Sequence, residues 1–162
     1  MVGSTVLVHR ELPIAEAEQL VNGVHDVMKL VVHRLQPAFE REGISTGQFW
    51  ALHVVSSLQS ASLSTVARHL AVSTPTVCAN VDQLEADGLV TRSRSARDRR
   101  TVVLALTPKG RKVEARIWSR IAHLVSEAAG GLPAEDVATA ARVFRELHRR
   151  LEPVDPVTEE KP

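Results

Sequence analysis

Two helix starts and one helix stop, all within a short segment, constrain the fold of this chain more than any other feature. Ser62 can cap a short helix over residues 63–70, and Ser73 can cap another after a turn at residues 71–73. Gly88 is typical of a helix end, because glycine adopts the left-handed backbone conformation at little cost. The spacing therefore predicts two short helices joined by a tight turn.

After this segment the apolar pattern changes from a helical period to alternation. Residues 89–94 and 101–106 are predicted to be two strands of a hairpin. The hairpin carries five arginines and one acid, which are Arg92, Arg94, Arg97, Asp98, Arg99 and Arg100. Two short helices followed by a basic hairpin indicate a winged helix-turn-helix, in which the hairpin is the wing.

The residues before this segment predict two further helices. A stripe of apolar residues at helical spacing predicts a long amphipathic helix over about residues 14–42, which Pro37 should kink or divide. Ser45 and Gln48 have the spacing of a capping box at the start of a second helix. Residues 56–62 are expected to form the end of that helix and a loop.

The residues after the hairpin predict a fifth helix over about residues 108–129 and a sixth over about 134–151. The fold class is thus mainly α with a small β-hairpin wing. The last eleven residues hold three prolines and four acids and are expected to be disordered. The predicted regions are a helical dimerisation region at 10–44 and 108–152, a winged helix-turn-helix at 45–107 and a tail at 153–162.

Composition excludes several classes of function. The net charge is only +1, so attraction to a polyanion must come from local clustering of charge. Aromatic residues make up 3% of the chain and tyrosine is absent, which argues against stacking on exposed bases. The single cysteine, Cys78, permits no disulfide within the chain. With no signal peptide or membrane segment recognisable in the sequence, we expect a cytoplasmic protein without a cofactor.

The predicted helix after Ser73 and the basic hairpin suit double-stranded DNA. An α-helix fits the major groove, where hydroxyl and amide side chains distinguish base edges. Arginines of a wing can neutralise phosphates or enter a narrow minor groove, and Asp98 can orient one of them. The candidate DNA-binding residues are Ser73, Thr74, Thr76, Asn80, Gln83, Arg92, Arg94, Arg97, Asp98, Arg99 and Arg100.

Three sequence motifs resemble the MarR family of bacterial transcription regulators. They are the run LSTVARHLAVSTPTVCANVDQLEADGLVTR at residues 63–92, DRR at 98–100 and LTPKG at 106–110. The resemblance covers nearly the whole chain. It implies a homodimer paired through the first, fifth and sixth helices, which binds a palindromic DNA site and is released by a small, often aromatic or anionic, ligand.

The resemblance also implies roles for residues of the wing. Asp98 and Arg100 would be its structural pair, and Arg97 or Arg99 would enter the minor groove. One departure from the family stands out, because residues 73–87 contain three acids and no lysine or arginine. The wing must then supply more of the electrostatic affinity. The alternative is a protein-interaction module that keeps the winged fold and binds DNA weakly or not at all.

Rare aromatic and histidine side chains suggest a possible ligand site. Trp50 and Trp118 are by default expected in core or dimer packing. The sharper hypothesis makes Trp50 and His53 a wall of a ligand crevice, with His33 either lining the crevice or at the surface. These three residues, His33, Trp50 and His53, are the candidate ligand-binding residues.

Other chemistry has weaker support in the sequence. Cys78 lies among apolar neighbours and has no second cysteine to resolve an oxidised sulfur, so an inert thiol is favoured over a redox switch. The seven histidines include no close pair with metal-ligand spacing. No nucleophile and base, phosphate-binding glycine loop or paired carboxylates are recognisable, so we expect neither a metal site nor an enzyme.

Overall fold

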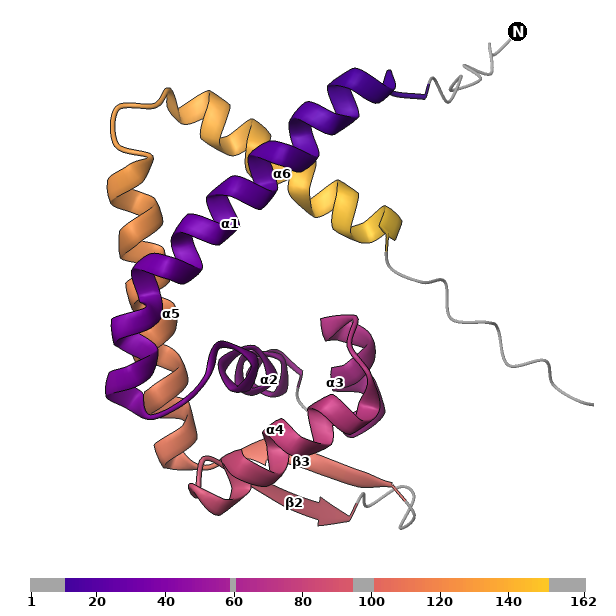
Figure 1. The fold of residues 1–162 in the computed structure, drawn as a ribbon, viewed down its shortest axis with the longest axis vertical. Coiled ribbons are helices and arrows are strands. Elements are labelled where there is room, and N and C mark those ends of the chain that lie inside the picture. The colour runs from indigo at the N-terminus through magenta and orange to yellow at the C-terminus, as the bar shows by residue number, and fades with distance from the viewer. Residues whose placement is uncertain (1–10, 59–60, 95–100, 152–162) are drawn as a thin grey trace, which may run out of the picture. The chain divides into compact units, whose positions relative to one another are not determined.

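The computed structural model describes residues 11–58, 61–94 and 101–151, and these form a mainly helical fold with a small antiparallel sheet (Figure 1). This confirms the predicted fold class. Contacts divide the chain into two compact units, residues 1–122 and 123–162. The elements are α1 (Ile14–Glu42), α2 (Thr46–Ser57), β1 (Ala61–Ser62), α3 (Leu63–Leu70), α4 (Thr74–Ala86), β2 (Val90–Arg94), β3 (Val102–Leu106), α5 (Pro108–Ala128) and α6 (Ala134–Leu151).

The helix starts predicted from serine residues are confirmed by side-chain hydrogen bonds. At the start of α2 the Gln48 backbone N–H donates to Ser45 Oγ at 3.2 Å, and the Ser45 N–H donates to Gln48 Oε1 at 2.6 Å. This reciprocal pair is the expected capping box. Ser62 Oγ caps α3 and Ser73 Oγ caps α4, accepting from backbone N–H groups three residues ahead at 3.1 and 3.3 Å.

Helix α1 runs through Pro37 as one helix, so the predicted division does not occur. Proline removes one hydrogen bond of the helical ladder, at a cost that packing of the surrounding turn can offset. Leu35, Ala38 and Phe39 are buried on either side of Pro37 and supply this packing. The helix ends at Gly43, whose φ of 68° is left-handed.

The sheet has three strands rather than the two of the predicted hairpin. Its order is β1-β3-β2, and Ala61 pairs with Leu104 while Arg92 pairs with Leu104 from the other side. The prediction of a helix end and loop over residues 56–62 is therefore wrong at residues 61 and 62, which form β1. A strand of two residues is too short to show alternation, and β1 exists because β3 offers it backbone partners.

The core of the first unit lies where α2 packs against α3, α4 and β3. Phe49 and Leu52 of α2, Val77 and Leu84 of α4 and Leu104 of β3 are all buried there. The two positions on α2 are three residues apart and the two on α4 are seven apart, as burial of one helical face requires. The core thus fixes which face of α4 remains outside.

The LTPKG motif joins the sheet to α5 through a close backbone contact. Thr107 Oγ1 donates to the Gly88 carbonyl at 2.7 Å and accepts from the Gly110 N–H at 3.0 Å, which caps α5. A Cβ atom added to Gly110 would lie 2.0 Å from the Leu89 carbonyl oxygen. Only glycine allows this approach, which explains the last residue of the motif.

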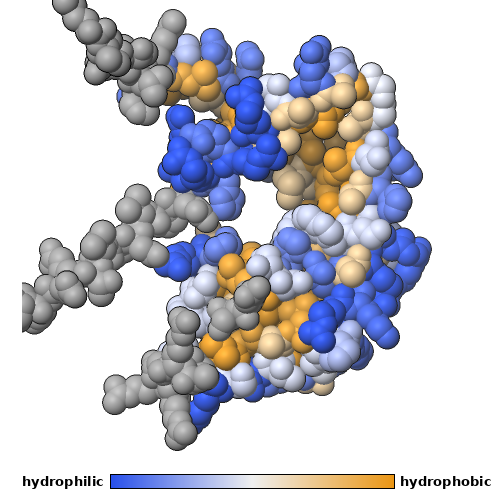
Figure 2. Space-filling view, turned by 180° about the vertical axis from the view of Figure 1, so that it is seen from behind, coloured by the Kyte–Doolittle hydropathy of each residue, from blue (hydrophilic) through white to orange (hydrophobic). Residues whose placement is uncertain are grey.

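Apolar side chains remain exposed on several helices of the single chain. On α1, Val21 and Val27 are more than half exposed, and on α6 the described residues include none that is buried. Figure 2 shows hydrophobic surface open on one face of the molecule. No helix in the described part of the chain combines the length and low charge needed to cross a membrane.

Candidate nucleic-acid interface

The N-terminal end of α4 presents short polar side chains to solvent. Ser73, Thr74 and Thr76 are all exposed, whereas Val77 and Val81 behind them are buried. The hydroxyls of Ser73 and Thr76 lie 2.7 Å apart, and Ser73 also caps the helix, so this pair is partly engaged. Thr74 has no side-chain hydrogen bond to any described residue and stays available to an incoming group.

The two amide side chains predicted to read bases have different surroundings. Asn80 is half-buried, and its Nδ2 atom would lie 3.3 Å from a Cβ atom added to Gly47, so its amide packs against the start of α2. Gln83 is exposed, and its Nε2 donates to both carboxylate oxygens of Asp87 at 3.2 Å. Of the two, Gln83 lies on the surface that a DNA groove could reach.

Strand β2 lies against α4 (Figure 1), and Arg92 of this strand pairs with two acids of that helix. Arg92 Nη2 donates to Asp82 Oδ1 at 2.5 Å, and Arg92 Nη1 donates to Glu85 Oε2 at 2.6 Å. Arg94, two residues further along β2, is exposed. The predicted wing residues Arg97, Asp98, Arg99 and Arg100 lie outside the described residues.

The three acids of residues 73–87 all have partners. Asp82 and Glu85 accept from Arg92, and Asp87 accepts from Gln83. The hydrogen bond that Arg92 donates to Asp82 raises the pKa of the Arg92 guanidinium; desolvation opposes this effect, and the bond to Glu85 adds to it. The pairing of Arg92 with Asp82 and Glu85 could not be predicted from a local sequence pattern, because these side chains meet only after the turn at Gly88 has formed.

Two basic residues that follow the hairpin are also held by the protein. Lys109 Nζ donates to the Asp87 carbonyl at 2.8 Å, and Arg111 Nη1 donates to the Leu106 carbonyl at 2.7 Å. Lys109 thereby satisfies a carbonyl at the C-terminal end of α4, where the helix dipole also favours a cation. These bonds fix the junction between α4, β3 and α5 and engage two of its cations.

Two of the three predicted ligand-binding residues, Trp50 and His53, lie close together. His53 lies between aromatic neighbours, with ring centroids 4.2 Å from Trp118, in a stacked arrangement, and 6.0 Å from Trp50, edge-on. His53 Nδ1 lies 2.8 Å from Glu114 Oε1, and because an ionised carboxylate only accepts, Nδ1 is the donor. His33 is exposed on α1 and lies outside this ring cluster.

Glu114 and Trp118 of α5 belong to this cluster, although the sequence suggested only Trp50 and His53 as a wall. Their spacing of four residues on one helix face was the available signal, but nothing in it pointed to His53. We call these four residues, Trp50, His53, Glu114 and Trp118, the aromatic cluster.

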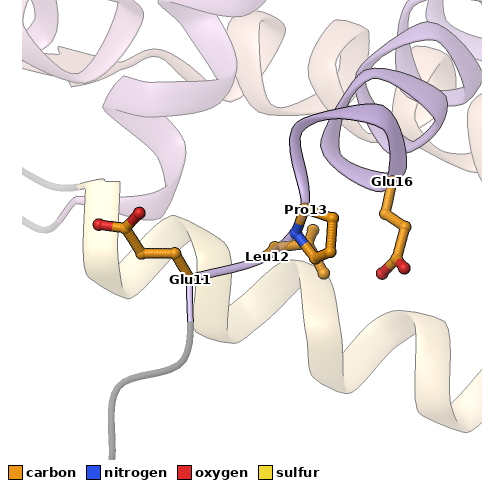
Figure 3. Close-up of a pocket in the computed structure, with 4 residues that line it drawn as sticks. All are labelled: Glu11, Leu12, Pro13 and Glu16. Carbon is orange, nitrogen blue, oxygen red and sulfur yellow. The ribbon is translucent and has the colours of Figure 1, made fainter.

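A cavity of about 310 Å³ lies at the start of α1, apart from both sets of predicted residues (Figure 3). Glu11, Leu12, Pro13 and Glu16 line it. The described residues contain no group of three or more His, Cys, Asp or Glu side chains placed to hold a metal. We therefore take neither the cavity nor a metal centre as the candidate site. The candidate site is the outer face of α4 together with the wing.

A tight helix–turn–helix from α3 to α4, followed by a two-stranded wing, defines a winged helix-turn-helix protein. Residues 42–101 match the model of the MarR family. The chain is 26% identical over 141 residues to the HTH-type transcriptional repressor MdtR of Bacillus subtilis, covering 84% of this chain and 90% of that protein. It is 28% identical over 109 residues to a putative transcriptional regulatory protein for the hcr operon of Thauera aromatica, covering 67% and 66% of the two chains.

The fold matches that of solved regulators as well. The transcriptional regulator BldR from Sulfolobus solfataricus superposes with a TM-score of 0.73 at 27% identity, over 87% of this chain and all of that one. Family model, relatives and fold agree with the motifs at residues 63–92, 98–100 and 106–110. In sequence and in fold, the chain is thus similar to transcriptional regulators of the MarR family.

Proposed function

We propose that the protein is a dimeric, sequence-specific DNA-binding regulator of the cytoplasm, and that it acts as a repressor at a palindromic operator. The observation that carries this proposal is the outer face of α4, whose polar N-terminal end is exposed beside a wing rich in arginine. A helix presented in this way fits the major groove while the wing reaches the adjacent backbone. Repression is proposed because the relative MdtR is a repressor.

Dimerisation is proposed because apolar side chains of α1 and α6 are exposed in the single chain. On α6, Val137 and Phe144 are 43% and 47% exposed, and on α1, Val21 and Val27 are 64% and 58% exposed. Large exposed apolar patches are rare on monomers and mark interaction sites. A second copy would cover it and present two α4 helices roughly 34–36 Å apart to successive major grooves.

An electrophoretic shift assay with DNA from upstream of the gene, at low and moderate salt, tests the DNA-binding proposal. Arg97→Ala and Arg99→Ala are each expected to weaken binding, and loss of a phosphate contact should reduce the salt slope by about 0.9. Glu18→Gln, at an exposed position on α1, is the control. If both arginine variants kept the affinity and salt slope of the wild type, the assignment of the wing would be wrong.

We further propose that a small aromatic acid is the effector and that it binds at the aromatic cluster. Trp118 is 43% exposed and His53 is half-exposed, so a ring surface is open to a ligand. His53 Nδ1 is engaged by Glu114, and Nε2 has no hydrogen-bond partner among the described residues. Nε2 is therefore available to hydrogen-bond with a polar group of the ligand.

Quenching of tryptophan fluorescence by an aromatic acid such as benzoate tests the effector proposal. Trp118→Phe should remove most of the quenching, because it removes the indole that stacks on His53. His53→Leu removes the hydrogen-bonding ring and should weaken binding. A His53→Leu variant with the affinity of the wild type would contradict the role of His53, and no quenching at all would contradict the site.

The alternative, a protein-interaction module that binds DNA weakly, was motivated by the acids of α4. Asp82 and Glu85 are paired with Arg92, which lowers the charge that these acids would present to DNA. The pairing therefore supports DNA binding over the alternative. An unbiased selection from random duplexes, made with the dimer intact, separates the two, because only the alternative yields no enriched sequence.

A further inference from the structure

Arg92 is the arginine of the predicted hairpin whose guanidinium is seen to form ion pairs with carboxylates of α4. Its two terminal nitrogens donate to Asp82 and Glu85 at 2.5 and 2.6 Å. Its side chain is only 25% exposed, against 64% for Asp82 and 40% for Glu85. We call these three residues the Arg92 triad.

The geometry of the triad ties the wing to α4 at a defined position. Asp82 and Glu85 are three residues apart, so their side chains lie on the same side of the helix. The Arg92 backbone is fixed by the ladder of β2 with β3, in register with Leu104, which is buried. A planar guanidinium with five donors can bind both carboxylates at once, which the single ammonium of a lysine does less well.

The same geometry leaves Arg92 poorly placed to contact DNA. The charge of the Arg92 guanidinium is already offset by two carboxylates that accept from its terminal nitrogens, and its side chain is only 25% exposed. Without Arg92, the two carboxylates would lie unpaired on the helix that enters the groove. Like charges brought together at an interface lower affinity strongly.

We propose that Arg92 is a positioning residue, which neutralises Asp82 and Glu85 and holds the wing against α4, and that it does not itself contact DNA. This inference rests on the proposed DNA-binding function. It accounts for a helix in the proposed DNA-binding site that has two acids and no basic residue. It also removes Arg92 from the predicted set of DNA contacts.

A mutant cycle tests the proposal by measuring Arg92→Ala in two backgrounds, the wild type and the doubly neutral variant Asp82→Asn/Glu85→Gln. Affinity for duplex DNA is measured by fluorescence anisotropy at fixed salt. In the wild-type background Arg92→Ala should weaken binding by about tenfold or more, because two carboxylates become unpaired. In the neutral background the same change should weaken DNA binding by less than about twofold, because neither carboxylate charge remains to be neutralised.

Arg94→Ala is the matched control, since it removes the same charge from the next residue on the same side of β2. Its effect on binding should be equal in the two backgrounds. If Arg92→Ala instead lost the same factor in both backgrounds, Arg92 would be a direct phosphate contact and the proposal would be overturned.

A second readout does not depend on DNA and keeps the inference separate from the proposed function. Arg92→Ala should lower the thermal unfolding midpoint by about 2–4 °C in the wild-type background and by clearly less in the neutral one. If the wild type bound no duplex in the random pool, the proposed function would fail while this thermal cycle still tested the triad. Equal thermal losses in both backgrounds would show that the ion pairs do not hold the wing.

Discussion

Gly110 shows how strongly one contact can restrict a residue. Its position in the first turn of α5 brings the helix backbone against the Leu89 carbonyl, 2.0 Å from where a Cβ atom would be. No flexible side chain lies in between, so the backbone of the sheet or of the helix would have to move. Gly23, in the exposed part of α1, has no atom within 4 Å of the same position and is the natural comparison.

Gly110→Ala is therefore expected to destabilise the protein by about 1–3 kcal/mol, as overpacking of a closed site does. Gly23→Ala should instead stabilise it by about 0.5–1 kcal/mol, because alanine loses less backbone entropy in a helix. Urea unfolding followed by circular dichroism at one protein concentration measures both. If Gly110→Ala lowered the free energy of unfolding no more than Gly23→Ala does, the contact with Leu89 would not be close.

Polar residues of α4 show that residue type alone does not decide a role. Asn80 and Gln83 have the same amide group and both follow the pattern expected of base-reading side chains. Packing against Gly47 holds Asn80 half-buried, whereas Gln83 is exposed and bonded to Asp87. The difference comes from where α2 crosses α4, which is a tertiary contact.

At the scale of elements, a single ion pair connects the C-terminal end of α1 with α5. Arg116 Nε and Nη2 donate to the two carboxylate oxygens of Glu42 at 2.7 and 2.6 Å. These hydrogen bonds lower the pKa of Glu42 below its ordinary value, with a smaller contribution from the charges of Arg116 and Arg120. The bidentate geometry orients the two helix segments relative to each other.

The lowered pKa predicts how stability depends on pH. Since the folded protein binds the Glu42 proton less tightly than the unfolded chain, the ion pair stabilises fully above about pH 5 and is lost as the pH falls through the lowered pKa. Glu42→Gln should therefore lower the urea midpoint at pH 7, and the difference from the wild type should shrink toward pH 3. Glu18→Gln, on the exposed side of α1, is the control. If the difference in urea midpoint between Glu42→Gln and the wild type stayed constant with pH, the ion pair would not be its cause.

At the scale of the whole molecule, the two units of the chain differ in how much apolar surface they bury. The first unit buries Phe49, Leu52 and Leu104 among others. In the second unit the described residues of α6 include none that is buried. A helix of this kind is stabilised by association, because propensity alone barely holds a short helix in water.

Phe144→Glu on α6 is expected to convert the proposed dimer into a monomer, because it places a charge in the apolar face that a second copy would cover. Val72→Glu is a matched control, since Val72 in the turn before α4 is 42% exposed, close to the 47% of Phe144. Sedimentation equilibrium measures the mass of each variant. A wild-type chain that sediments as a monomer would contradict the proposed dimer, and so would a Phe144→Glu variant that stays dimeric.

Local signals determined most of the elements. Serine caps at 45, 62 and 73, the glycine stop at 88 and the change of apolar period after α4 are properties of adjacent residues, and the structure reproduces each of them. The motifs at residues 63–92, 98–100 and 106–110 pointed to the MarR family for the same reason, because their spacing is read along the chain. The roles of the wing residues 97–100 lie outside the described residues and remain predictions.

Only the tertiary structure decided which residues meet. The strand β1 exists through its pairing with β3, α1 continues through Pro37 because its neighbours are buried, and His53 acquires Glu114 as a partner from a helix 61 residues away. Arg92 looked like one more cation of the hairpin until folding placed it against Asp82 and Glu85. The physical reason is common to all four: hydrogen bonds and ion pairs form between groups brought within a few ångströms, and chain order does not encode that distance.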